Sequence, residues 1–154
     1  MHKGSAIRLL INTIAKPLQI GFYENGNLIE VKDYDGMTSD ILLPILEDIL
    51  EKNSIEEIIY TNGPGSHMAT KIAYVLLKTL SIIKQIPFYA VSAFELNGNN
   101  PIKALGKLYF IKEKETIITL RFDKEPKSSF KMPNSLNNLN ILEANEPNYQ
   151  IAAV

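Results

Sequence analysis

The chain has 154 residues, of which 45% are hydrophobic and 21% are charged, and its formal net charge at pH 7 is −1. This length predicts one domain with at most a small appendage, and the charge balance excludes the basic surface that independent nucleic-acid binding needs. The chain has no cysteine, which excludes thiol catalysis, disulfides and cysteine-based zinc sites. No apolar run approaches a membrane span or a secretory signal, so we expect a soluble cytoplasmic protein that does not enter a membrane.

Three strands are expected first, at residues 6–13, 18–23 and 28–34. Glu24-Asn25-Gly26-Asn27 is a hairpin signal between the second and the third. A helix follows that reaches about residue 53, and Thr38, Ser39 or Asp40 can cap it. The pattern then predicts a strand at 57–61, a helix at 66–85, a strand at 87–91 and a short helix near 93–97.

The composition shifts after Gly98-Asn99-Asn100-Pro101. Residues 106–122 predict a β-hairpin that turns at 112–115, and from Asp123 onward Pro, Asn and Ser accumulate without periodic apolar positions. We therefore expect a complete N-terminal lobe at residues 1–98 and a reduced C-terminal lobe at residues 99–154.

The turn Gly63-Pro64-Gly65-Ser66 connects a buried strand to a long helix. Such a turn can hold an anion on free backbone N–H groups, or it can be the tightest route from strand to helix. The sequence matches neither the P-loop nor the dinucleotide fingerprint. A structural role for Gly63 and Gly65, with Ser66 as the helix N-cap, is therefore favoured.

The two long helices carry more apolar surface than one sheet can cover. An apolar band of about 200° covers helix 66–85, roughly twice what a surface helix needs. One arc of this band holds Ala69, Ile72, Ala73, Leu76, Leu80 and Ile83, and the adjoining arc holds Met68, Val75, Thr79 and Ile82. Helix 40–53 repeats the excess. Either the helices are buried by each other and by the C-terminal part, or they form a partner interface that includes Ile41, Ile45, Met68, Ile72, Val75, Leu76 and Thr79.

Several motifs together resemble those of the TsaB (YeaZ) family. Gly63-Pro64-Gly65-Ser66, then Ile86-Pro87 and Val91-Ser92-Ala93-Phe94-Glu95-Leu96, resemble the family's GPGSFTGLRIG, IP and VSSLEAL. Upstream, residues 39–45 resemble the family's HSE-x-LLP-x-I, and residues 106–109 fall where the family has G-E-V-Y. The likeness covers about residues 6 to 110, and the order and spacing of the motifs make it fairly specific.

The resemblance implies an α/β protein of the RNase H-like, actin-like (ASKHA) fold, and the order βββαβα is that of one half of this superfold. It also implies a non-catalytic scaffold that supports threonylcarbamoyladenosine modification of ANN-decoding tRNAs, without catalytic residues, metal or cofactor. The expected partner is the catalytic subunit TsaD, in a heterodimer through such helices, with the TsaE ATPase in the larger assembly. Without TsaD a homodimer is expected, and tRNA is met only through the complex.

The chain departs from the family pattern at several positions. Asn12 stands where the family has an aspartate, and a neutral amide is a poor anchor for Mg²⁺. Thr38 replaces a histidine, His67-Met68-Ala69 replaces F-T-G, Lys71 replaces an arginine and Ala73 a glycine. We interpret His67 as a half-exposed residue at the helix start and expect no role for His2.

The alternative from another class is an active ATP-dependent phosphotransferase of the same superfold. It would need two full lobes and a metal-binding carboxylate, and the sequence indicates neither. A stand-alone endopeptidase, suggested earlier for the wider family, has no motif here.

Overall fold

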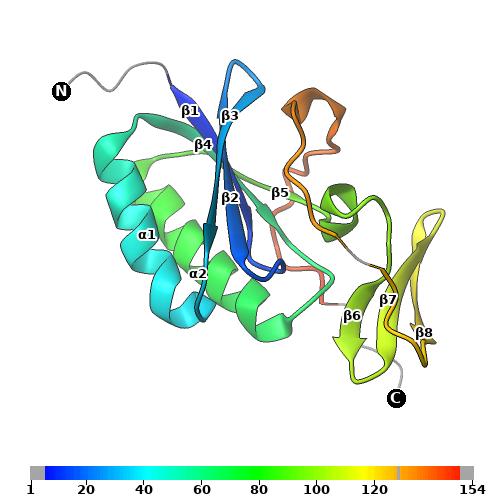
Figure 1. Cartoon of the computed structure of the whole chain (residues 1–154). Coiled ribbons are helices and arrows are strands. Elements are labelled where there is room, and N and C mark those ends of the chain that lie inside the picture. The colour runs from blue at the N-terminus through cyan, green and yellow to red at the C-terminus, as the bar shows by residue number, and fades with distance from the viewer. Residues whose placement is uncertain (1–5, 128, 150–154) are drawn as a thin grey trace.

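The computed structural model describes residues 6–127 and 129–149, and these form a mixed α/β protein with a five-stranded sheet and two α-helices (Figure 1). The strands lie in the order β3-β2-β1-β4-β5. The sheet is antiparallel from β3 to β1 and parallel from β1 to β5. Their bounds are β1 (Ile7–Asn12), β2 (Leu18–Glu24), β3 (Asn27–Tyr34), β4 (Ile55–Thr61) and β5 (Phe88–Val91). The prediction of the α/β class and of each of these strands is confirmed.

The hairpin between β2 and β3 forms at the predicted residues. Asn25 and Gly26 have φ angles of 54° and 79°. Two successive left-handed residues match the twist of paired strands, and asparagine and glycine adopt that conformation most readily.

The helices begin in different ways. In α2 (His67–Lys84), Ser66 is the N-cap, as predicted, and its hydroxyl accepts a hydrogen bond from the Ala69 N–H at 3.3 Å. In α1 (Thr38–Lys52), the N-cap is Met37, which makes no side-chain capping bond. The prediction that Thr38, Ser39 or Asp40 caps this helix is therefore wrong, because all three already lie in its first turn.

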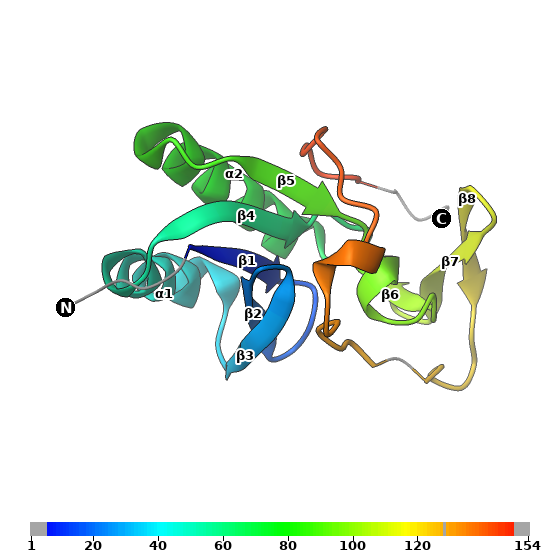
Figure 2. The same cartoon turned by 90° about the horizontal axis from the view of Figure 1, so that it is seen from above.

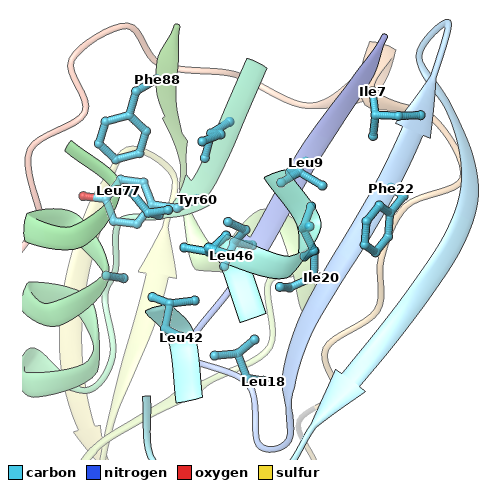
Figure 3. Packing of buried hydrophobic residues seen from close by; sticks show 14 of the residues in the cluster. Ile7, Leu9, Leu18, Ile20, Phe22, Leu42, Leu46, Tyr60, Leu77 and Phe88 are labelled. Carbon is cyan, nitrogen blue, oxygen red and sulfur yellow. The ribbon is translucent and has the colours of Figure 1, made fainter. Parts of the chain in front are cut away.

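The helices α1 and α2 cover one face of the sheet and form the larger core with it (Figures 1 and 3). Leu42, Leu46 and Ile49 of α1, with Ala73 and Leu77 of α2, are buried there. The sheet contributes the side chains that point to this face from β1, β2, β4 and β5: Ile7, Leu9, Ile11, Leu18, Ile20, Phe22, Ile58, Tyr60, Phe88 and Ala90.

The C-terminal segment, residues 130–149, covers the opposite face of the sheet with residues 130–141 and then passes the edge of β5 to the glycine turn and the start of α2 (Figures 1 and 2, orange to red). Met132 and Leu136 pack there against Leu10, Tyr23 and Ile59. The segment contains the short 3₁₀ helix η2 (Leu136–Asn138), and another 3₁₀ helix, η1 (Ala93–Leu96), lies beside it. The predicted short helix near 93–97 is confirmed as η1.

Hydrogen bonds join the C-terminal segment to the sheet at both sides. At the β2–β3 hairpin, the N–H of Leu28 donates to the Asn134 carbonyl at 2.9 Å, and the N–H of Leu136 donates to the Gly26 carbonyl at 3.0 Å. At the outer edge of β5, Ala90 and Leu142 exchange two backbone hydrogen bonds of 2.9 and 2.7 Å. The segment thus spans the whole sheet.

Two buried tyrosines add side-chain hydrogen bonds to this segment. The hydroxyl of Tyr23 donates to the Pro133 carbonyl at 2.7 Å, and that of Tyr60 donates to the Asn145 carbonyl at 2.6 Å. Both side chains are fully buried. Burial raises the pKa of each phenol well above its usual range, because the phenolate would lose its hydration.

A second, antiparallel sheet of three strands is found in the described residues, beyond η1 and away from the helices (Figure 1). It contains β6 (Ile102–Leu105), β7 (Leu108–Glu113) and β8 (Thr116–Arg121). The predicted hairpin is β7–β8, whereas β6, which has only four residues, was not predicted. Ile102 and Phe110 pack on Phe94 of η1. The division into lobes at residue 98 stays a prediction.

The tyrosine contacts predict how stability depends on pH. Below pH 10 the Tyr60→Phe variant should be about 1 kcal/mol less stable than the wild type, because the Asn145 carbonyl loses its donor. Since the folded-state pKa of Tyr60 is raised, the unfolded chain ionises first, and wild-type stability falls by up to about 1.4 kcal/mol per pH unit above pH 10. The phenylalanine variant lacks this loss, so the difference should vanish near pH 11.

Urea unfolding at pH 8 and pH 11 measures the difference. Tyr89→Phe is the control at pH 8, since no hydrogen bond of the Tyr89 hydroxyl is found among the described residues, and it should cost less. A cost of Tyr60→Phe that is equal at the two pH values would contradict the argument.

Candidate functional site

Asn12 lies at the end of β1, at the position where the family pattern has an aspartate that could bind a metal ion. Asn12 is fully buried, and its Oδ1 accepts hydrogen bonds from the N–H groups of Ile14 and Ala15, each at 3.1 Å. The Thr61 hydroxyl donates to the same oxygen at 3.2 Å. This oxygen therefore holds the loop between β1 and β2 and joins it to β4. Across residues 6–127 and 129–149, no three His, Asp or Glu side chains are grouped as a metal site would require.

The glycine turn at the end of β4 is packed against the chain's own C-terminal segment. Gly63 has a φ of 118°, and a Cβ there would lie 2.6 Å from the Asn148 carbonyl oxygen. The N–H of Asn148 donates to the Asn62 carbonyl at 2.7 Å, and the Gly63 carbonyl accepts from the Ala93 N–H at 2.9 Å. Gly63 is needed both for its backbone conformation and for this close approach.

At Gly65 a different neighbouring side chain leaves no room for a Cβ atom. A Cβ at Gly65 would meet the Ile14 side chain at 2.8 Å, so the turn also lies directly against the loop between β1 and β2. Gly63 and Gly65 are both buried, whereas Ser66 is exposed at the helix start. The structural role predicted for the turn agrees with this geometry, and an anion on the Gly63 side would have to displace residues 146–148.

His67 is the first residue of α2 and is exposed. Its ring meets the edge of the Tyr149 ring, with 5.2 Å between the centroids. The side chain therefore joins the helix start to the end of the described C-terminal segment.

The outer face of α2 carries an apolar stripe. Met68, Val75 and Ile82 are spaced by seven residues, which places them in one line along the helix, and they are 68%, 55% and 68% exposed. Thr79 lies in the same region and is exposed, and its hydroxyl already donates to the Val75 carbonyl at 2.7 Å. This face, Met68, Val75, Thr79 and Ile82, is called the α2 stripe below.

The other predicted interface residues lie deeper. Ile72 and Leu76 are half-buried along α2, and Leu76 contacts the core. Ile41 and Ile45 of α1 are also half-buried and pack on the same core. Of the predicted interface residues, Met68, Val75 and Thr79 therefore lie on an exposed face of α2, and the four others are half-buried.

The apolar arc predicted for helix 66–85 is rotated from the buried side that the structure shows. The buried side is formed by Thr70, Ala73 and Leu77. The predicted arc omits Thr70 and Leu77 and includes Ile83, which is 66% exposed. Thr70 can be buried because its hydroxyl donates to the Ser66 carbonyl at 2.7 Å. Ile83 is exposed because it lies about 120° around the helix from the buried Leu77.

No family model matches the sequence, and no curated protein matches it. Among solved structures, the chain is similar to YeaZ from Pseudomonas aeruginosa, with a TM-score of 0.53 and 16% identity, over 90% of this chain and 68% of that chain. A second structure, described as an uncharacterized protein with similarity to peptidase YeaZ from Pseudomonas aeruginosa, has a TM-score of 0.53 and 17% identity. This similarity extends over 96% of this chain and 69% of that chain.

The chain has the fold of YeaZ. This agrees with the resemblance that the motifs around Gly63 and Val91 indicate. Identity of 16–17% establishes a shared fold and leaves activity and partners to be argued from the residues. In the described part of the chain, neither α1 nor α2 is long and apolar enough to cross a membrane.

The close approach at Gly63 gives a stability prediction. Gly63→Ala should lower the free energy of unfolding by about 3 kcal/mol, because it adds a strained backbone and a contact with the Asn148 carbonyl. Gly106→Ala is the matched control: Gly106 has a φ of 57° and no atom within 4 Å of the added Cβ, so about 1 kcal/mol is expected. Chemical denaturation measures both, and equal costs would show that the Asn148 contact imposes no constraint.

Proposed function

We propose that the chain is a member of the TsaB (YeaZ) family and a non-catalytic scaffold subunit. Its partner is TsaD, and the pair supports threonylcarbamoyladenosine modification of ANN-decoding tRNAs, with the TsaE ATPase in the larger assembly. Without TsaD the chain pairs with itself, and tRNA is bound only through the complex. The fold similarity to YeaZ and the motifs at residues 39–45, 63–66 and 91–96 support this assignment.

The strand order supports the finer fold assignment. A sheet ordered β3-β2-β1-β4-β5, with β3, β2 and β1 antiparallel and β1, β4 and β5 parallel, is the arrangement of an RNase H-like lobe of the actin-like superfold. In that superfold a second lobe repeats the first. Here the residues after β5 form a small antiparallel sheet and an extended segment.

The exposed α2 stripe is the observation that carries the scaffold proposal. Residues 130–141 lie on the opposite face of the sheet, and the segment meets α2 at the helix start, where Tyr149 contacts His67 (Figures 1 and 2). The neighbouring helix α1 leaves Val75 and Ile82 more than half exposed. An aligned apolar surface of this kind on a helix is typical of helix–helix association.

The interface proposal predicts the effect of a charge at Val75. Val75→Glu should weaken pairing with itself or with TsaD at least 100-fold, because an unpaired buried charge costs about 3 kcal/mol or more in the complex. The monomer should stay folded by circular dichroism, since Val75 is 55% exposed. Co-expression with TsaD of the same organism, followed by size-exclusion chromatography with light scattering, measures the pairing.

Ile82→Glu should act like Val75→Glu, because it lies on the same stripe. Leu105→Glu is the control: Leu105 is 63% exposed but ends β6, so pairing should be unchanged. Normal pairing of both stripe variants would place the interface elsewhere, and unfolding of Val75→Glu would assign this residue to the core.

The alternative, an active phosphotransferase, makes the opposite prediction for nucleotide turnover. The isolated protein should release no phosphate from ATP with Mg²⁺, because Asn12 offers no carboxylate and its oxygen already accepts three hydrogen bonds. Turnover that survives repurification and is lost in a folded Asn12→Ala variant would favour the phosphotransferase.

A further inference from the structure

The two helices carry opposite charges. Helix α1 contains four carboxylates and one lysine, whereas α2 contains three lysines and no carboxylate. The helices lie side by side and run in the same direction, with both starts at the same end of the molecule (Figure 1). The net charge of the whole chain, −1, does not reveal this separation.

Three carboxylates of α1 form a row on its outer side, called the acidic row below: Asp40, Glu47 and Glu51. At about 100° per residue, these positions lie within about 40° of one another and opposite the buried side of the helix. All three are exposed, and none of them has an ion-pair partner among the described residues. The fourth carboxylate, Asp48, is already paired with Lys52 at 2.9 Å.

Two lysines of α2, Lys71 and Lys78, form the basic row. Both lie about one turn from Tyr74, whose ring packs beside Phe88 of β5. The other edge of the α2 stripe, at Ile72, lines a pocket together with the start of α1. The basic row therefore borders the stripe on the side away from α1. In residues 6–127 and 129–149, neither lysine has an ion-pair partner.

The two rows match in spacing and in position along the helices. Asp40 and Glu47 are seven residues apart, as are the two lysines of the basic row, which is about 10.5 Å along a helix. Counted from the first residue of its helix, Asp40 lies two residues in and Lys71 four. Glu47 and Lys78 lie nine and eleven residues in. The members of each pair thus differ by about 3 Å along the helix direction.

A two-fold dimer through the helical face has two simple arrangements. With the axis parallel to the helices, α1 of each copy lies on α2 of the other, and the helices keep the same direction. We call this the crossed arrangement. With the axis across the helices, α1 lies on α1 and α2 lies on α2, in opposite directions. The crossed arrangement places acidic rows against basic rows, whereas the other places like charges together, which is unfavourable.

We propose that the chain pairs with a second copy of itself in the crossed arrangement. The α2 stripe and Leu43 of α1, which is 43% exposed, form the apolar centre of the contact. At its borders, Asp40 lies near the partner's Lys71 and Glu47 near the partner's Lys78. This inference rests on the pairing proposed for the α2 stripe and adds the geometry that the charges select.

Introduced cysteines test the arrangement directly, because the chain has none of its own. Glu47→Cys chains and ¹⁵N-labelled Lys78→Cys chains are mixed until subunits exchange, treated with a short bismaleimide and analysed by mass spectrometry. The crossed arrangement predicts a product that joins one chain of each kind. Lys103→Cys, on β6, replaces Lys78→Cys as the control and should give no product with Glu47→Cys. Links between identical chains in place of the mixed product would overturn the proposal.

Charge reversal provides the second readout, with sedimentation velocity as the measurement and circular dichroism as the check of folding. Lys71→Glu with Lys78→Glu should weaken self-association at least about ten-fold, because four contacts of the symmetric dimer become repulsive. Adding Asp40→Lys and Glu47→Lys to the same chain should restore it, because both rows are then reversed.

A control separates these contacts from the effect of net charge. Lys103→Glu with Lys124→Glu changes the net charge by the same amount, in and just after the second sheet. Self-association should then change less than about three-fold, because charges far from the contact are screened at physiological salt. An equal loss in this control and in the basic-row variant would overturn the proposal.

Failure of this proposal can be told apart from failure of the scaffold function. If Val75→Glu abolishes self-association and reversal of the basic row does not weaken it, the crossed arrangement is wrong and the α2 stripe remains the interface. A wild-type chain that stays monomeric but binds TsaD would refute the self-pairing and keep TsaD as the partner. A chain that binds neither would refute both proposals.

Discussion

The attachment of the C-terminal segment to the second face of the sheet is the constraint on which the rest of the structure depends. A sheet with helices on one face only would expose Leu10, Tyr23 and Ile59 to water. Residues 130–141 bury this face without an α-helix, and backbone groups of the C-terminal segment are paired at the β2–β3 hairpin and at the edge of β5. Tyr23 and Tyr60 each donate a buried hydroxyl hydrogen bond to a carbonyl of this segment. The segment also pairs with β5, and thereby protects an edge that would otherwise be open to another strand.

This arrangement decides which surface remains available to a partner. The glycine turn is covered, because Asn148 binds Asn62 and lies over Gly63. The second face of the sheet is covered by the same segment. On the helical side the segment reaches the start of α2, where Tyr149 contacts His67, and the α2 stripe stays exposed at Met68, Val75 and Ile82. A chain that closes one face with its own C-terminal segment and leaves an apolar helix face open is suited to association through that face.

The sequence predicted the local elements well, because their signals are local. Alternating and continuous apolar runs define β1, β2, β4 and β5, Asn25-Gly26 defines the hairpin, and Ser66 defines the start of α2. The rotation of α2 was harder to predict: Thr70 is polar by residue type, and only its bond to the Ser66 carbonyl allows its burial. Strand β6 was missed, because its four residues are held by pairing with β7 rather than by their own pattern.

Contacts between residues far apart in the chain could not be predicted from the sequence. The path of residues 130–149 is set by hydrogen bonds to residues about a hundred positions earlier, such as Tyr23 with Pro133. A pocket of about 510 Å³ likewise joins three segments that are distant in the chain, at Thr13, Met37 and Met68. For the α2 stripe the signal was present, since a spacing of seven residues from Met68 through Val75 to Ile82 aligns these side chains on any helix.

Asn12 shows why this fold can lack the chemistry of its superfold and still remain intact. Its Oδ1 receives two backbone N–H groups and the Thr61 hydroxyl, so it closes the loop between β1 and β2 and joins that loop to β4. An aspartate could accept the same three hydrogen bonds, but a metal ion would compete with them for the oxygen. The amide accepts these bonds and carries no charge that would need a counterion in a fully buried position. The residue thus serves the loop between β1 and β2 through its oxygen, while its Nδ2 is buried without a hydrogen-bond partner among the described residues.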